Sequence, residues 1–168
     1  MTNTEIENIL YGWINGLLSM TAIFAYPDAP RPTSSYVLIN FLTDIQLGTH
    51  EINSVLQPDE STNNTYSALN EVTFSINTYY DGAFQKAVDI QKSLMKLTVE
   101  EYLFNNGLGF INMTQIQKIP ELIDKKWEER AQFDISFSVR KETTENIETI
   151  KKIELTNEID NTTTTIQE

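Results

Sequence analysis

The sequence predicts an α+β domain in which helices pack on one face of a mostly antiparallel sheet of about four to five strands. The first observation is a segment, 127–140, in which apolar and polar side chains alternate almost without interruption. The second is the three- and four-residue spacing of apolar side chains in segments 6–17 and 84–95, which is typical of helices with one buried face. The length of 168 residues fits a single domain, expected over residues 1–160.

The chain is expected to begin with a helix. Thr4 is a suitable N-cap, and Leu10 and Trp13 belong to its apolar stripe. Gly12 and Gly16 lie on the same segment, where each lowers helix stability by up to ~1 kcal/mol relative to alanine. Alternatively, these glycines mark places where the backbone of a strand comes close.

Two strands are expected to follow, separated by a long loop. The proline-rich segment 27–32 is predicted to be a stiff connector. Alternation over 36–47 and 69–80 predicts two half-buried strands. Residues 48–68 lack any periodicity and are predicted to form an acidic loop that contains Asp59 and Glu60.

The second half of the chain repeats this order of helix and strands. A helix is expected over 84–95, a short helix with a capping-box pattern at 98–101 and a stop at 106–107, and a strand over 108–118. The strand at 127–140 would be about 45 Å long at ~3.3 Å per residue, so part of it is expected to project from the domain. One more strand is expected within 147–159, followed by a flexible tail at 161–168.

Charge and composition limit the function classes. The chain has 24 Asp and Glu against 12 Lys and Arg, a formal net charge of −12, so it should repel nucleic acid and anionic membranes. No apolar stretch reaches the roughly 20 residues of a membrane span. The absence of cysteine excludes disulfides, thiolate nucleophiles and cysteine-ligated metals. Protein partners, or DNA that passes without binding, fit this charge.

No catalytic, cofactor or metal site is predicted. His50, the single histidine, follows a Gly-Thr pair and has no neighbouring acid or nucleophile, so it is expected in an exposed loop. The acidic pairs at 59–60, 100–101 and 128–129 are read as solvated charges rather than a general acid and base. Gly107 and Gly109 follow a helix instead of preceding one, which is the wrong order for a phosphate-binding loop. An enzyme is therefore not expected.

Two segments carry more information. Arg31 stands between Pro30 and Pro32 directly ahead of a strand, and Trp127 and Arg130 stand at the start of the longest strand. One interpretation makes both arginines ordinary surface charges, with the tryptophan covering the edge of the core. The other places these five residues at a contact with another subunit or partner, where arginine pairs with carboxylates and aromatic residues serve as anchors.

Taken in order, five segments resemble the phage neck terminator family of tailed bacteriophages. The resemblance extends from about residue 6 to residue 159, and the family pattern has a proline where Glu129 stands. The segments are Ile9–Trp13, Ala29–Pro32 before a strand, Tyr79–Tyr80 at a strand end, Gly107–Phe110 and Trp127–Asp134.

The resemblance implies a structural virion protein with a tail-terminator-like α+β fold. Such proteins form a ring, commonly of six subunits, that caps the tail tube and joins it to the head connector around a channel for DNA. It implies partners in the tail tube, the sheath and the connector, assembly in the host cytoplasm, and no cofactor. The loop with Asp59 and Glu60 would line the channel or touch a neighbouring ring.

Two rival functions are left open by the residues. The first is a small acidic protein-binding module of the inhibitor or immunity type, which would be a monomer that occupies a basic cleft. The second is an enzyme, which would require buried carboxylates of raised pKa in a deep cleft. Self-association separates the ring from the inhibitor.

Overall fold

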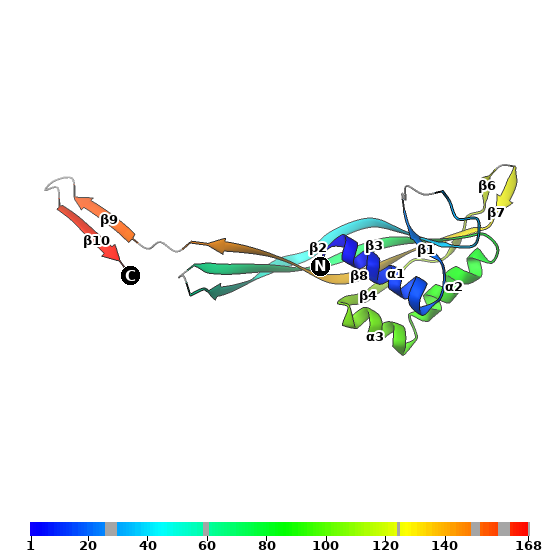
Figure 1. Cartoon of the computed structure of the whole chain (residues 1–168), viewed down its shortest axis with the longest axis horizontal. Coiled ribbons are helices and arrows are strands. Elements are labelled where there is room, and N and C mark those ends of the chain that lie inside the picture. The colour runs from blue at the N-terminus through cyan, green and yellow to red at the C-terminus, as the bar shows by residue number, and fades with distance from the viewer. Residues whose placement is uncertain (26–29, 59–60, 124, 149–151, 158–161, 168) are drawn as a thin grey trace. The chain divides into compact units, whose positions relative to one another are not determined.

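The computed structural model describes residues 1–25, 30–58, 61–123, 125–148, 152–157 and 162–167. The chain divides into two compact units, and the single domain expected over 1–160 stays a prediction. Unit 1 comprises Met1–Thr49 and Ala68–Lys141, and unit 2 comprises His50–Ser67 and Glu142–Glu168. The helices and strands, most of them labelled in Figure 1, follow in chain order. They are α1 (Asn3–Tyr11), the π-helix η1 (Gly12–Leu17), β1 (Ala22–Phe24), β2 (Val37–Leu56), β3 (Thr62–Tyr79), α2 (Ala83–Ser93), α3 (Leu97–Asn105), β4 (Leu108–Met113), β5 (Gln117–Lys118), β6 (Glu121–Ile123), β7 (Lys126–Glu128), β8 (Arg130–Ile147), β9 (Lys152–Asn157) and β10 (Thr162–Gln167).

The predicted α+β class is confirmed, with three α-helices and a mixed, mostly antiparallel sheet. The sheet has six strands in the order β1-β2-β3-β8-β4, with β5 also paired to β8, so the expected four to five strands were too few. β1 runs parallel to β2, whereas β4 and β5 run antiparallel to β8. β1 and β5 have three and two residues, which is too short to show a period.

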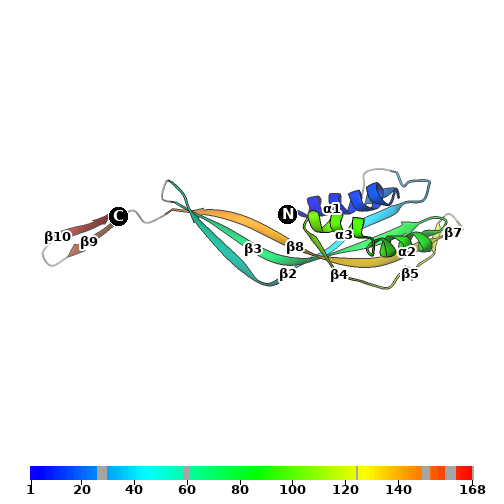
Figure 2. The ribbon, with the colours of Figure 1, turned by 90° about the horizontal axis from the view of Figure 1, so that it is seen from below.

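The helices cover one face of the sheet in unit 1, and the core lies between them. Figure 2 shows α1, α2 and α3 on the same side of the strands. Alternate residues of β8 face this core, as the sequence predicts, and so do apolar residues of β2 and β3. The buried side chains from these strands are Val37, Ile39, Val72, Phe74, Ile76, Ala131, Phe133, Ile135, Phe137 and Val139. Full burial of one such large side chain contributes about 1.5–3 kcal/mol.

The first helix is capped two residues earlier than the sequence predicts. Thr2, not Thr4, is the N-cap, and it forms a capping box with Glu5. Trp13 is fully buried, donates a hydrogen bond from Nε1 to Ser93 Oγ at 3.0 Å, and packs edge-on against Phe137. These contacts attach the N-terminal helices to α2 and to the sheet.

Gly12 marks a close approach, but the approaching element is a helix rather than a strand. A Cβ at Gly12 would collide with the hydroxyl of Tyr102 from α3, and this hydroxyl donates to the Ile9 carbonyl at 3.2 Å. A Cβ at Gly16 would meet open space. The size of residue 12 therefore sets how closely α3 packs against the first helix.

Unit 2 overturns the prediction of a loop over 48–68. Residues 48–56 belong to β2 and residues 62–68 to β3; Gln57 N donates to Ser61 O at 2.8 Å between them. Every described residue of β2 in this unit is exposed, so burial imposes no alternation there. His50 lies in strand β2 instead of a loop, and its ring contacts that of Tyr66.

The end of the chain also differs from its prediction. β9 and β10 form an antiparallel hairpin, with Thr162 opposite Asn157 and Gln167 opposite Lys152. The tail expected at 161–168 therefore contains a strand; Asn161 and Glu168 lie outside the described residues. Threonine favours strands, and four consecutive threonines fall within β10.

Candidate functional site

The two arginines singled out in the sequence meet at one aromatic ring. The guanidinium carbon of Arg31 lies 5.0 Å from the Tyr79 ring centroid, and that of Arg130 lies 5.3 Å from it. Tyr36 stacks on Tyr79 with 4.7 Å between the ring centroids. Cation–π contacts of this kind contribute about 0.5–1 kcal/mol each at partly exposed positions. The cluster joins the proline-rich connector and Tyr36, directly ahead of β2, to β3 and β8.

Arg31 is held by partners from its own chain. Its Nε donates to the Tyr36 hydroxyl at 2.9 Å, and its Nη2 donates to Glu128 Oε2 at 2.7 Å. Burial raises the pKa of Tyr36 and also that of Tyr79, so both rings stay neutral at physiological pH. Pro32 supports the same region, because its carbonyl accepts from the Tyr80 hydroxyl at 3.0 Å.

Arg130 is also engaged within the chain. Its Nη2 donates to Asn77 Oδ1 at 2.8 Å, and Asn77 is only 3% exposed. Its Nη1 lies 3.8 Å from a Glu121 carboxylate oxygen, and its buried Nε has no acceptor among the described residues. These contacts make Arg130 a support for the end of the sheet; a role at a subunit contact stays a prediction.

Trp127 lies on a small hairpin formed by β6 and β7. Leu122 and Trp127 are direct cross-strand partners and are 57% and 71% exposed. Directly opposite residues in a strand pair share one face of the hairpin. The hairpin therefore presents an adjacent leucine and tryptophan to solvent.

The base of this hairpin is firmly attached to unit 1. Glu129 accepts from the Gly82 backbone N–H at 2.9 Å and from Lys118 Nζ at 3.1 Å, and its own carbonyl accepts from Tyr80 N. The Lys118 ammonium, helped by the Gly82 N–H, lowers the pKa of Glu129. The strand predicted as continuous over 127–140 is interrupted at Glu129, where these bonds replace regular pairing.

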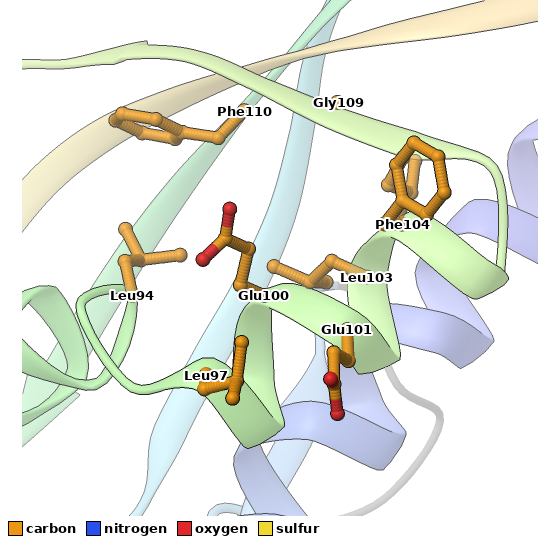
Figure 3. A pocket seen from close by; sticks show the side chains of 9 residues that line it. Leu94, Leu97, Glu100, Glu101, Leu103, Phe104, Gly109 and Phe110 are labelled. Atoms are coloured by element: carbon orange, nitrogen blue, oxygen red, sulfur yellow. The ribbon is translucent and has the colours of Figure 1, made fainter.

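A groove opens between α3 and β4, with a volume of about 520 Å³. Its lining is mainly apolar, and two of its side chains, Leu97 and Phe104, are 66% and 76% exposed. Figure 3 shows the Glu100 carboxylate turned toward Phe110, while Glu101 points away from it. β4 is the last strand in the order of the sheet, so the groove lies beside an edge strand whose outer side is not paired with another strand of the sheet.

The groove was not predicted from the sequence, although α3 carries a signal for it. Val99 and Leu103 form the buried stripe of the helix. Leu97 and Phe104 lie seven residues apart on another face and are exposed. A short helix with apolar residues on two faces indicates a second contact besides the core.

Three predicted contact residues remain, namely Pro30, Asp59 and Glu60. Asp59 and Glu60 lie outside the described residues, and so do positions 27–29 of the proline-rich segment. Pro30 is exposed. Within the described ranges, no three His, Asp or Glu side chains gather as metal ligands would.

The described helices include none with the length and apolarity that crossing a membrane requires. The model of the family described as "Phage neck terminator protein" matches residues 4–163, nearly the whole chain. Among curated proteins, none matches the chain.

Proposed function

The chain belongs to the phage neck terminator protein family, and we propose that it acts in the virion neck as a ring-forming, non-enzymatic joint between tail and head. The family makes it a structural protein of the phage neck. The observation that carries the proposal is the family match over residues 4–163.

Exposed apolar side chains in unit 1 support a role in assembly. The hairpin of β6 and β7 presents Leu122 and Trp127, and the groove of α3 and β4 presents Leu97 and Phe104. Contiguous apolar surface of this kind usually marks a contact with another protein. Tryptophan in particular is enriched among the residues that dominate binding energy.

The charge of the chain supports a passage for DNA through the ring. A lumen rich in lysine and arginine would bind phosphates and retard the movement of DNA. With a net charge of −12, six copies would carry a large excess of negative charge. DNA would therefore pass through the proposed ring without sequence-specific binding.

The proposal includes specific partners. One side of the ring, expected to have six subunits, would close the tail tube and, in a contractile tail, adjoin the sheath. The other side would meet the connector proteins of the head. Assembly would take place in the host cytoplasm before the virion is complete.

Electron microscopy of the purified full chain tests the proposal. We expect annular particles with a central hole, and we expect the purified protein to restore joining when it is added to heads and tails that lack it. Solitary particles at high concentration that also fail to join heads to tails would contradict it. A stable complex of one monomer with a basic protein would instead favour the inhibitor-type function.

A further inference from the structure

We propose that the exposed hairpin of β6 and β7 in one subunit inserts Trp127 into the groove between α3 and β4 of a second copy of this chain. The inference rests on the proposed function, because it names the contact by which the ring closes. It concerns unit 1 alone, which contains both surfaces.

The hairpin has the properties of a rigid insert. Trp127 and Leu122 form an adjacent exposed pair, while the following residues hold the base. Glu128 binds Arg31, and Glu129 binds the Gly82 N–H. Because side chains alternate along a strand, anchoring Glu128 on one face of β7 directs Trp127 to the opposite face. The backbone that carries Trp127 is therefore held in place before any contact with a second copy forms.

The groove has a size and lining that match this insert. Its 520 Å³ falls within the range of about 300–1,000 Å³ that is typical of binding pockets. Leu94, Leu103 and Phe110 lie around it, with Leu97 and Phe104 at its open side. Burial of an indole among leucine and phenylalanine side chains removes 150–250 Å² of surface per aromatic ring, on the order expected for an anchor residue.

Charge complementarity favours a second copy of the chain as the occupant. Glu100 and Glu101 line the groove, with the Glu100 carboxylate turned toward Phe110 (Figure 3), and the hairpin carries Lys125 just before β7 and Lys126 at the first position of β7. All four are exposed, and none makes an ion pair with another described residue. In a chain with twice as many acidic as basic residues, two adjacent free lysines beside an exposed tryptophan offer a local match to an acidic groove.

The positions of the two surfaces make the contact head-to-tail. The hairpin lies near the N-terminal end of α2, whereas α3 follows its C-terminal end (Figures 1 and 2). Each subunit would therefore present a hairpin on one side and a groove on the other. A contact between different surfaces repeats from subunit to subunit and closes as a ring when the rotation permits.

Complementation between two defective variants of the full chain tests this contact. Trp127→Ala removes the insert and Phe104→Glu blocks the groove, and both positions are too exposed for either change to disturb the core. We expect each variant alone to be monomeric, with self-association weakened about 30-fold or more. Mixed together they should form a 1:1 dimer, because one intact groove meets one intact hairpin. Light scattering with native mass spectrometry measures all three samples.

Matched controls and a charge reversal complete the test. Phe84→Ala removes an exposed phenylalanine of α2 outside both surfaces and should leave assembly unchanged. Glu100→Lys with Glu101→Lys should weaken assembly, and adding Lys125→Glu with Lys126→Glu should restore it to within about threefold of the original. Circular dichroism confirms that each variant is folded; Leu122→Ala and Leu97→Glu replace any variant that is not.

The outcomes separate this inference from the proposed function. If the original chain forms rings and the Trp127 and Phe104 variants form them equally well, the inference fails and the ring stands. If these variants form rings but no longer bind tail or connector proteins, the occupant of the groove is a different protein, and the inference also fails. If the original chain never self-associates, the proposed ring fails together with the contact.

Discussion

Replacing Arg130 with alanine should destabilise the folded monomer. The change leaves the buried Asn77 oxygen without its donor at 2.8 Å, which costs about 1–3 kcal/mol. Loss of the contact with the Tyr79 ring adds about 0.5–1 kcal/mol, and loss of the 3.8 Å pair with Glu121 adds less than about 0.5 kcal/mol because both groups are partly exposed. Since neighbouring contacts are not additive, we expect a total of about 2–3 kcal/mol.

Urea unfolding of the full chain measures this loss. The Trp127→Ala background keeps self-association from contributing to the measured stability. For a chain of this size the melting temperature should fall by about 4–12 °C. Asn77→Ala alone and together with Arg130→Ala should reveal a coupling of about 1 kcal/mol, whereas Lys92→Ala, an exposed cation of α2, should change little.

The same variant distinguishes the two roles of Arg130. Without the Trp127 change, Arg130→Ala should weaken assembly only if the guanidinium reaches another subunit. If Arg130→Ala abolishes ring assembly while the free energy of unfolding stays within about 0.5 kcal/mol of the original, the in-chain contacts are not what the residue provides. The reasoning from Asn77 and Tyr79 would then be refuted.

Three further predictions concern the packing and the acid stability of unit 1, each measured by urea unfolding. Gly12→Ala should lower stability by about 1–2 kcal/mol, because its methyl group displaces the Tyr102 hydroxyl; an unchanged value would show that α3 adjusts freely. Ser93→Ala should cost about 1–3 kcal/mol, since the buried Trp13 N–H loses its acceptor; a neutral effect would contradict that bond. Burial raises the pKa of Asp44, but hydrogen bonds from a lysine and an asparagine outweigh it and leave the pKa lowered. The ionised Asp44 carboxylate stabilises the fold at any pH above its unfolded-state pKa, and this contribution is lost as the pH falls through its pKa in the folded protein. The free energy of unfolding of Asp44→Asn should therefore fall less steeply with decreasing pH than that of the original chain. If the free energy of unfolding of Asp44→Asn fell as steeply with pH as that of the original chain, another group would be responsible for the acid sensitivity.

The fold was predictable where burial imposes a period on the side chains. β8 in unit 1 and the core strands β2 and β3 alternate because one face meets the helices. Residues 48–56 are all exposed, and within 62–68 only Ser67 is buried, so burial imposes no apolar alternation on these strands and their sequence resembles a loop. β1 and β5 are held by pairing with long neighbours, a tertiary effect that two or three residues cannot encode.

The candidate site was predictable as a set of unusual residues but not as an arrangement. The context of Arg31, Trp127 and Arg130 was enough to single them out in the sequence. The partners of the two arginines could not be predicted from the sequence, because the Tyr79 ring and Asn77 belong to a strand about 50 positions away along the chain from either arginine. The groove of α3 and β4 depends on how a helix stands against a sheet edge, which no local pattern specifies.

The native mass of the purified full chain decides whether its copies associate into a ring. We expect a closed assembly at six times the 19.3 kDa chain, which forms with a defined stoichiometry as concentration rises. A single 19.3 kDa species at every concentration, with purified tail and head components present or absent, would contradict it.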